Sequence, residues 1–221
     1  FKMVDPEKGA GNKEFISTEL SDMGIIIKTR RSSKAELYKN SSKYKLVLRI
    51  NPNKFYKPYM KTEHISNIIE FCDMVERLDM QIQYCFSGLT IDDFEITRVD
   101  LTEDIHGIPE DKITQYIRIM RQLYLTLGFH HNKKLEENTE GFDPDSSFNA
   151  VNDSKKVEFV VYNKGHEVRN KKNSSDEQKE HYKDTMRVEV RCRKKFADKL
   201  SEKAYTAQKL VEIYRRRMEV I

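Results

Sequence analysis

Alternation between polar and apolar residues predicts several strands in this chain and gives two of them a charged face. Over residues 94–105 the alternation puts Val99 and Leu101 on one face and four polar residues on the other: Arg98, Asp100, Thr102 and Asp104. Over residues 186–193 one face carries Arg187, Glu189 and Arg191. Charged groups in the middle of neighbouring strands are costly unless they are paired, solvated or bound to an ion. The pattern therefore predicts a metal or phosphate site on a rigid sheet.

A third segment adds charge at the end of an apolar strand. Residues 157–163 are apolar up to Tyr162, and Lys164 and Glu167 follow near the end of this strand. Together with residues 147–151 the segment is expected to form a hairpin.

The remaining pattern predicts further strands and helices. Additional strands are expected over residues 24–30, 43–50 and 81–86. Apolar residues at helical spacing predict helices over 62–78, 109–127 and 195–218. Helices interleaved with runs of strands predict an α+β fold, in which helices cover a mainly antiparallel sheet.

The polar segments indicate how the chain is divided. Residues 1–22 are expected to be a loose lead-in, followed by a single domain over 23–221. The polar stretches 131–145 and 169–184 have little to bury and are predicted to be mobile loops. The first residue is Phe1 rather than Met, so further residues of the natural protein are expected beyond the ends.

Composition changes this picture only a little. The chain has 40 Lys and Arg residues against 36 Asp and Glu residues, and a net charge of +4 does not by itself indicate a nucleic-acid binder. Three cysteines without ligand-like spacing indicate reduced thiols. The sequence has no signal peptide and no apolar run as long as a membrane span, so a cytoplasmic protein is expected. A Gly-rich phosphate loop is also missing, which argues against an ATP-driven helicase.

Three short motifs lie on the charged segments in a fixed order: Arg98-Val99-Asp100, Tyr162 to Glu167, and Arg187-Val188-Glu189. With the strand that ends at Pro52, they resemble the replication initiation factors of rolling-circle plasmids and filamentous phages, the trans-acting Rep and phage X-like tyrosine nickases. The resemblance implies a Rep-nuclease fold of the HUH type. It also implies a catalytic domain that nicks one DNA strand at an origin, through a tyrosine nucleophile and a divalent metal, and keeps the 5′ phosphate attached.

The resemblance implies roles for the charged residues. Mg²⁺ or Mn²⁺ would be held by Asp100 and Glu189, with Asp104 and Glu167 as further ligands. Lys164 would contact the phosphate or the phosphotyrosine. The residues expected to bind DNA are Arg98, Arg187, Arg191 and Lys209. The alternative is that these charges only form cross-strand salt bridges on an exposed sheet face, or an ion pair at the strand end.

The nucleophile is expected C-terminal to the third motif, which leaves Tyr205 and Tyr214. Tyr214 lies within an apolar stripe of the last predicted helix and is more typical of a core residue. Tyr205 lies off that stripe, one helical turn from Lys209, whose charge would stabilise a phenolate. Tyr205 is therefore the first choice, and a nucleophile beyond residue 221 stays open.

Two functions of different classes follow from these observations. The first is an initiator that nicks and rejoins origin DNA, single-stranded or cruciform, in a bacterial host cell. A host helicase and a second copy of the chain are further candidate partners. The second is a replication or transfer protein that binds origin DNA without cutting it. A domain that only binds proteins is a remoter third alternative.

Overall fold

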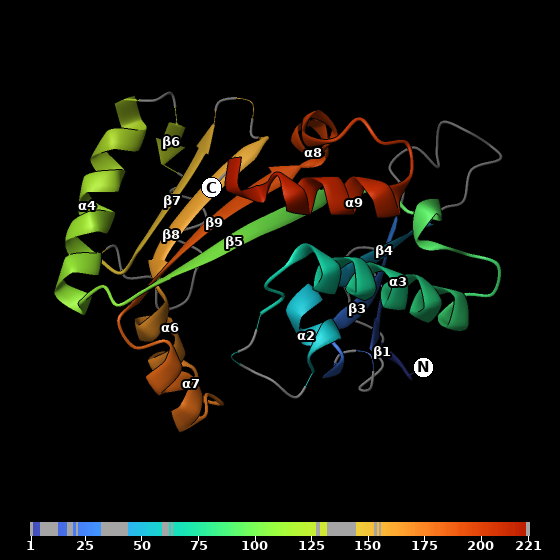
Figure 1. Cartoon of the computed structure of the whole chain (residues 1–221), viewed down its shortest axis with the longest axis horizontal. Coiled ribbons are helices and arrows are strands. Elements are labelled where there is room, and N and C mark those ends of the chain that lie inside the picture. Colours follow the sequence, from blue (N-terminus) through green and yellow to red (C-terminus); the bar gives the residue numbers. More distant parts are fainter. Residues whose placement is uncertain are drawn as a thin grey trace. The chain divides into compact units, whose positions relative to one another are not determined.

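The computed structural model describes residues 2–4, 13–16, 20, 22–31, 44–58, 62, 64–126, 129–131, 145–152, 154 and 156–219. They belong to two compact units, Phe1–Met74 and Val75–Ile221 (Figure 1). The division falls inside helix α3 (Ile68–Cys85), whereas the sequence suggests a boundary near residue 22. Residues 132–144, the inner part of one predicted loop, lie outside the described residues.

The first unit contains an antiparallel sheet in the order β1-β2-β3-β4. Its strands are β1 (Lys2–Val4), β2 (Lys13–Ile16), β3 (Ile25–Arg31) and β4 (Tyr44–Ile50). The strands predicted over residues 24–30 and 43–50 are confirmed as β3 and β4, which pair antiparallel, and the predicted lead-in supplies β1 and β2. Helix α2 (Pro52–Tyr56) follows directly, because the Asn51 side chain accepts a hydrogen bond from the Lys54 amide at 3.1 Å and caps the helix.

Helix α3 differs from the sequence prediction at both ends. It begins later than the predicted helix over residues 62–78 and continues to Cys85, so the strand predicted over 81–86 is wrong. The reason is that the buried side chains keep helical spacing beyond residue 78: Phe71, Met74, Val75, Leu78 and Ile82. A short apolar run by itself does not distinguish a strand from the continuation of a helix.

The second unit is built on an antiparallel sheet in the order β5-β9-β8-β7-β6. Its strands are β5 (Arg98–His106), β6 (Phe129–His131), β7 (Ser147–Asn152), β8 (Val157–Asn163) and β9 (Thr185–Arg193). This arrangement confirms the predicted α+β fold and the hairpin of β7 and β8. It also makes β5, β9 and β8, which carry the three motifs, direct neighbours.

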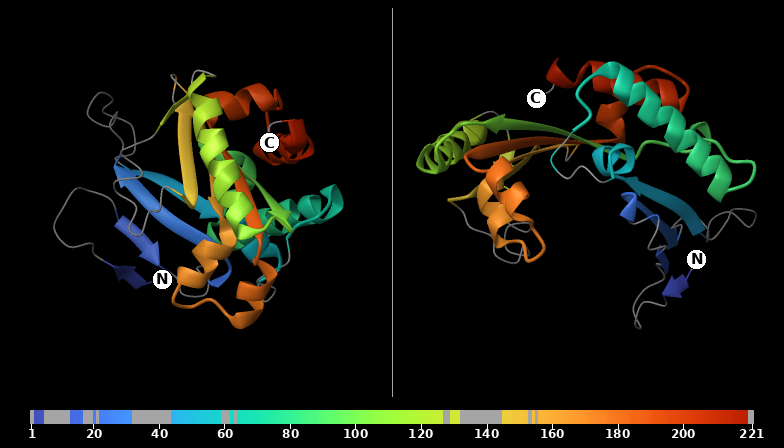
Figure 2. Two further views of the ribbon diagram at one scale, coloured as in Figure 1. Left: turned by 90° about the vertical axis from the view of Figure 1, so that its left-hand side faces the viewer. Right: turned by 60° about the horizontal axis from the view of Figure 1, so that its bottom comes forward.

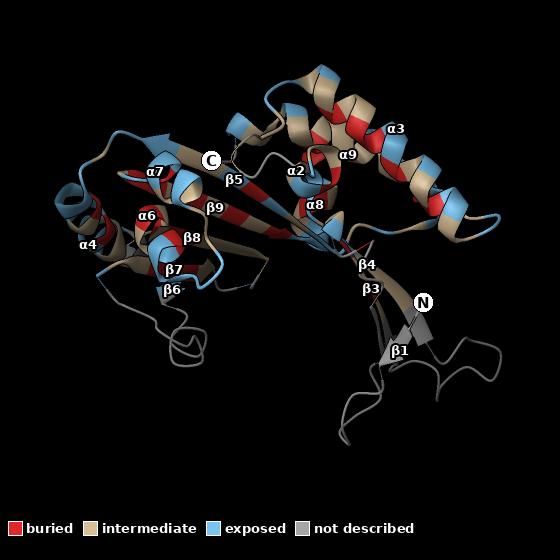
Figure 3. Ribbon diagram, turned by 90° about the horizontal axis from the view of Figure 1, so that it is seen from below, coloured by how far each residue is buried: buried red, intermediate tan, exposed pale blue. Residues whose placement is uncertain are grey.

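Three helices cover the apolar face of this sheet: α4 (Glu110–Thr126), α8 (Lys194–Leu200) and α9 (Thr206–Arg215). One core cluster joins α4 to the strands: Ile113, Ile117, Phe148, Ala150, Val161, Met186 and Val188. A second cluster joins α8 and α9 to β5 and β9: Leu101, Val190, Cys192, Ala197, Leu200 and Ile213 (Figure 3). Because strand side chains alternate, the charged residues of β5 and β9 point to the opposite face.

The last predicted helix is interrupted. The sequence predicts one helix over residues 195–218, but α8 ends before Ser201 and α9 begins after Tyr205. A short 3-10 turn, η2 (Arg217–Glu219), follows. The break turns the helical phase, so Ile213 is the buried residue of α9, whereas Met218, the last residue of the predicted helix, is exposed.

The stretch 169–184, predicted as a loop, contains regular structure. Helix α6 (Lys164–Asn170) runs into it, and α7 (Asp176–His181) follows, capped reciprocally by Ser175 and Gln178. Tyr182 then returns the chain to the sheet and is buried. In the right-hand view of Figure 2, α6 and α7 lie on one side of the sheet, and α8 and α9 on the other.

Candidate functional site

The charged face is the side of the second sheet opposite helices α4, α8 and α9. Four neighbouring strands contribute to it: Arg98, Asp100, Thr102 and Asp104 from β5, Arg187, Glu189 and Arg191 from β9, Glu158 and Tyr162 from β8, and Asn149 from β7. Alternation therefore predicts correctly which residues of β5 and β9 share a face. Glu158, Asn149 and the position of Tyr162 were missed from the sequence. Alternation along β8 could have found Glu158, which lies two positions from Val160 and four from Tyr162.

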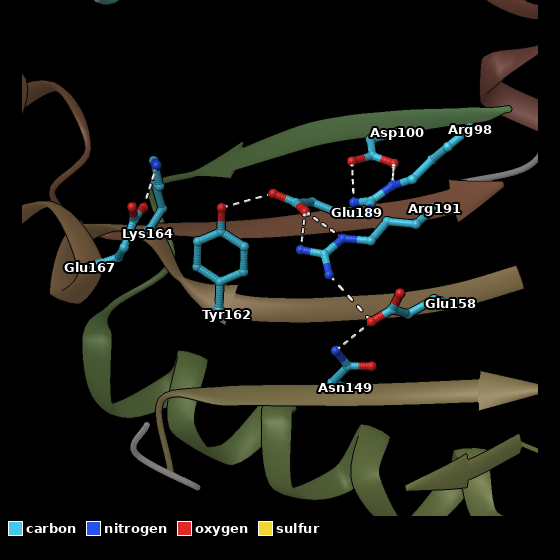
Figure 4. A network of polar contacts seen from close by, with 9 residues as sticks. All are labelled: Arg98, Asp100, Asn149, Glu158, Tyr162, Lys164, Glu167, Glu189 and Arg191. Carbon is cyan, nitrogen blue, oxygen red and sulfur yellow. Dashed lines mark hydrogen bonds and ion pairs between the residues drawn. The ribbon is translucent and has the colours of Figure 1, made fainter. Parts of the chain in front are cut away.

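A chain of polar contacts crosses this face from β9 to β7 (Figure 4). Arg191 is its centre: it contacts Glu189 Oε2 through Nη2 at 3.1 Å and Glu158 Oε1 through Nη1 at 3.3 Å. Each of these carboxylates also accepts a hydrogen bond from a neutral donor. The Tyr162 hydroxyl donates to Glu189 Oε1 at 2.9 Å, and Asn149 Nδ2 donates to Glu158 Oε1 at 2.7 Å.

Arg98 and Asp100 form a second ion pair at the start of β5. The guanidinium Nε and Nη2 donate to Oδ1 and Oδ2 of the carboxylate, each at 2.5 Å. Both side chains are 39% exposed. A pair that is so open to water stabilises a protein by about 1 kcal/mol or less, so its partners are easily separated.

Arg187 and Asp104 join β9 to β5 and form the most protected of the described ion pairs on the charged face. They are opposite each other in the register and are joined by two hydrogen bonds of 2.5 and 2.6 Å. Their side chains are only 12% and 9% exposed. Burial would lower the pKa of Arg187, but the hydrogen bonds to Asp104 and its charge outweigh that effect and raise it. Asp104 is therefore bound into the sheet by Arg187 rather than presented to a ligand.

Lys164 lies beside the charged face at the start of α6. Its ammonium forms an ion pair with Glu167 and lies 5.8 Å from the ring centre of Tyr162 and 5.4 Å from that of Tyr182. Burial lowers the pKa of Lys164, and the nearby charge of Arg187 acts in the same direction. Lys164 and Glu167 therefore form the ion pair at the strand end that was the alternative to a role in the site.

Tyr162 is held in its neutral form. Burial raises the pKa of its phenol, and the negative charge of Glu189 acts in the same direction. The hydroxyl is therefore a proton donor that fixes the orientation of Glu189.

The two predicted nucleophiles lie on or beside helices that pack against the other face. Tyr205 precedes α9 and is 59% exposed, whereas Tyr214 is half-buried with the Arg217 guanidinium 3.9 Å from its ring centre. Lys209, the expected partner of Tyr205, pairs with Asp198 at 2.7 Å. Asp100 and Glu189 therefore lie on one face of the sheet, whereas the helix of Tyr214, which Tyr205 precedes, packs against the other face.

The chain is similar to a known protein family over a region that includes the charged face. Residues 7–213 match the Phage_CRI family model, which is described as the N-terminal region of a replication-associated protein. The chain belongs to this family. The match confirms the resemblance at the level of a phage replication initiator and includes all residues of the charged face. No curated protein and no solved structure matches the chain.

The charged face of this Phage_CRI member carries carboxylates that could bind a metal ion. Among the described residues no three His, Cys, Asp or Glu side chains form a group that could hold a metal ion. Asp100 and Glu189 occupy diagonal positions of adjacent strands, because Asp100 is opposite Arg191. Such positions are about 7–8 Å apart, within reach of long side chains. Mg²⁺ is commonly bound by one or two carboxylates together with water and substrate phosphates, and this pair fits that kind of site.

The described helices of this Phage_CRI member differ from membrane spans in length or polarity. In the part of the chain that the structure describes, none is both long enough and apolar enough to cross a bilayer.

Proposed function

We propose that this Phage_CRI member initiates rolling-circle replication by nicking and rejoining one strand of origin DNA, through a 5′-phosphotyrosine and with Mg²⁺ or Mn²⁺. One observation carries the proposal: arginines and carboxylates from three adjacent strands share one face of a rigid sheet. Guanidinium groups bind phosphate oxygens, and carboxylates bind hard cations. A metal-dependent nickase would use both groups around the scissile phosphate, the arginines to bind it and the cation to stabilise its charge.

The charged residues would have separate roles in binding DNA and the cation. Arg98 and Arg191 would bind phosphates of the DNA strand, and Lys164 would add a positive charge beside the face. Asp100 and Glu189 would hold the cation, whose chemistry is to neutralise charge on the scissile phosphate. Tyr162 would keep Glu189 in position through its hydroxyl.

Tyr205 remains the preferred nucleophile over Tyr214. It is exposed, whereas the Tyr214 ring is covered by Arg217. The start of α9 also contacts η1 (Ile91–Asp93), the turn that precedes β5, because the Ala207 amide donates to Asp92 Oδ1 at 2.9 Å. Tyr205 therefore lies towards the start of β5, where Arg98 and Asp100 are found. In the reaction its phenol oxygen would form a bond to phosphorus while the bond from phosphorus to the 3′ oxygen breaks. The phenolic proton would pass to water, and the leaving oxygen would take a proton from water to become the 3′ hydroxyl.

The direct test is incubation with Mn²⁺ and a single-stranded origin oligonucleotide, followed by a denaturing gel and peptide mapping of the product. The expected result is a DNA-linked peptide that contains Tyr205. A linked peptide with another tyrosine would move the nucleophile, and DNA binding without any covalent product would reject the nickase.

The second candidate function is an origin-binding protein that does not cut. The placement of Tyr205 and Tyr214 favours it, because they lie beside and on α9, which packs against the opposite face of the sheet. Salt-sensitive binding of origin DNA that needs no metal and gives no covalent product would support this alternative. A helicase and a second copy of the chain remain expected partners of either function.

A further inference from the structure

We propose that the charged face exchanges ion-pair partners when DNA binds. Arg98 and Arg191 leave Asp100 and Glu189 for DNA phosphates, and the released carboxylates take up a divalent cation. DNA and the cation then strengthen each other's binding. This inference rests on the proposed function of the face as the nicking site, and it adds a rule for how the site is assembled.

The ion pairs themselves give the first argument. In the free protein Asp100 is held by Arg98, and Glu189 is held by Arg191. A carboxylate that is neutralised by a guanidinium attracts a cation weakly, and the same guanidinium attracts a phosphate weakly. Each ligand therefore needs the other to separate the pair.

The neutral donors give the second argument. If Arg191 moves to a phosphate, the carboxylates that it leaves are still held in place. Glu189 keeps the hydroxyl of Tyr162, and Glu158 keeps the amide of Asn149. A side chain that is already oriented loses little freedom when it binds a cation. The two carboxylates therefore stay in place to bind a cation after Arg191 has moved.

The contacts also show which pairs exchange. The bonds of Arg191 to its carboxylates are long, at 3.1 and 3.3 Å, and the pair of Arg98 and Asp100 is open to water. Arg187 and Asp104 are nearly buried, with side chains only 12% and 9% exposed, so water and ligands reach this pair least. We therefore assign the exchange to Arg98 and Arg191, while Arg187 stays with Asp104.

The test measures the affinity of a fluorescein-labelled single-stranded origin oligonucleotide for the full chain, with and without Mg²⁺ at constant ionic strength. A Tyr205→Phe Tyr214→Phe background prevents formation of the proposed covalent product. Mg²⁺ competes with a protein for DNA phosphates, so without exchange it weakens binding. If the ion-pair partners exchange, Mg²⁺ increases the affinity for the oligonucleotide by about tenfold, which is a typical size for coupling between two sites.

Two variants separate the exchange from general electrostatics. Asp100→Asn and Glu189→Gln are expected to bind the oligonucleotide more tightly without Mg²⁺, because an arginine is released, and to lose the gain from Mg²⁺. The matched control is Asp145→Asn, which removes one charge from the exposed bidentate pair with Arg118 on α4. It is expected to keep the full response to Mg²⁺.

The outcomes distinguish the two proposals. Binding that is unchanged or weakened by Mg²⁺ overturns the exchange, even where the wild-type chain forms a covalent product and the proposed function stands. A chain that binds no oligonucleotide under either condition overturns both. Asp100 is exposed, so Asp100→Asn keeps the test valid even where Glu189→Gln fails to fold.

Discussion

At the scale of single residues, the phenol of Tyr162 shows how burial and hydrogen bonding select one form of a side chain. Burial and the charge of Glu189 raise its pKa, so the folded protein keeps the hydroxyl protonated. The unfolded chain ionises at the ordinary value of 10.0. The folded state therefore gains stability from this group below pH 10, and loses it as the pH rises above that value.

Tyr162→Phe removes the hydroxyl but keeps the ring. We expect the free energy of unfolding at pH 8 to fall by about 1–2 kcal/mol, because Glu189 loses a buried donor. Above pH 10 the difference from the wild type should become smaller, since the wild type loses its advantage there. Urea unfolding at both pH values measures this.

Tyr116→Phe on α4 is the matched control, because Tyr116 is exposed. Its effect should stay within about 0.5 kcal/mol. An equal loss in both variants would show that the bond to Glu189 does not stabilise the fold.

The two ion pairs of β5 should differ in their contribution to stability. Asp104→Ala leaves the buried guanidinium of Arg187 unpaired and should cost about 3 kcal/mol or more. Asp100→Ala leaves the exposed Arg98 in water and should cost less than about 1 kcal/mol. Urea unfolding compares the two variants, and equal losses would contradict the difference in burial.

At the scale of secondary-structure elements, the sequence predicts the strands of the second unit well. Alternation has the same period in every strand, so the faces of β5 and β9 follow without knowledge of their neighbours. The order of the strands does not follow, because pairing of β5 with β9 joins residues that are far apart in the sequence. The helices over 68–85 and 194–215 were predicted less well, since apolar spacing does not reveal where a helix continues or breaks.

The candidate site could be predicted only in part, because the sequence does not reveal which strands pair or in which register. Asp100 and Glu189 were found from alternation and resemblance, but their partners depend on the register. Asn149 reaches Glu158 only because β7 pairs with β8. Arg191 lies between Glu189 of its own strand and Glu158 only because the register of β8 with β9 places Glu158 opposite Arg191. The capping box at Ser175 is a local signal of α7 that was missed in the sequence.

Gly165→Ala tests how closely α6 approaches the end of α7. Helix propensity predicts that alanine stabilises by about 0.5–1 kcal/mol. In the structure, a Cβ atom at residue 165 would lie 2.7 Å from the backbone oxygen of Tyr182. We therefore expect destabilisation, by about 1–3 kcal/mol, since the backbone must shift. Thermal unfolding decides between the two, and a more stable variant would contradict the close approach.

At the scale of the whole molecule, the family match includes residues of both compact units. Helix α3 begins in the first unit and ends in the second. A shortened chain that starts at residue 75 would cut this helix and remove Phe71 and Met74, two of its buried residues. A fragment for study of the second sheet should therefore keep α3 whole.

The salt dependence of DNA binding tests the proposed phosphate contacts. Each phosphate contact of a single strand contributes about −0.7 to the slope of log K against log salt. Arg191→Ala and Arg98→Ala should each reduce the slope by about that amount, as measured by fluorescence anisotropy from low to high NaCl. Arg118→Ala removes an equal charge from α4 and should leave the slope unchanged. An equal reduction in all three would indicate a diffuse field rather than contacts.

The pairing of arginine with carboxylate on the charged face also bears on how such a protein would search for its target. Bulk nucleic acid is held mainly by the uncompensated positive charge that a protein presents. Here the guanidinium groups of Arg98 and Arg191 are compensated from within the same sheet. The charged face would therefore bind unrelated DNA weakly. The chain would dissociate quickly from wrong sites and sample more of them in a given time.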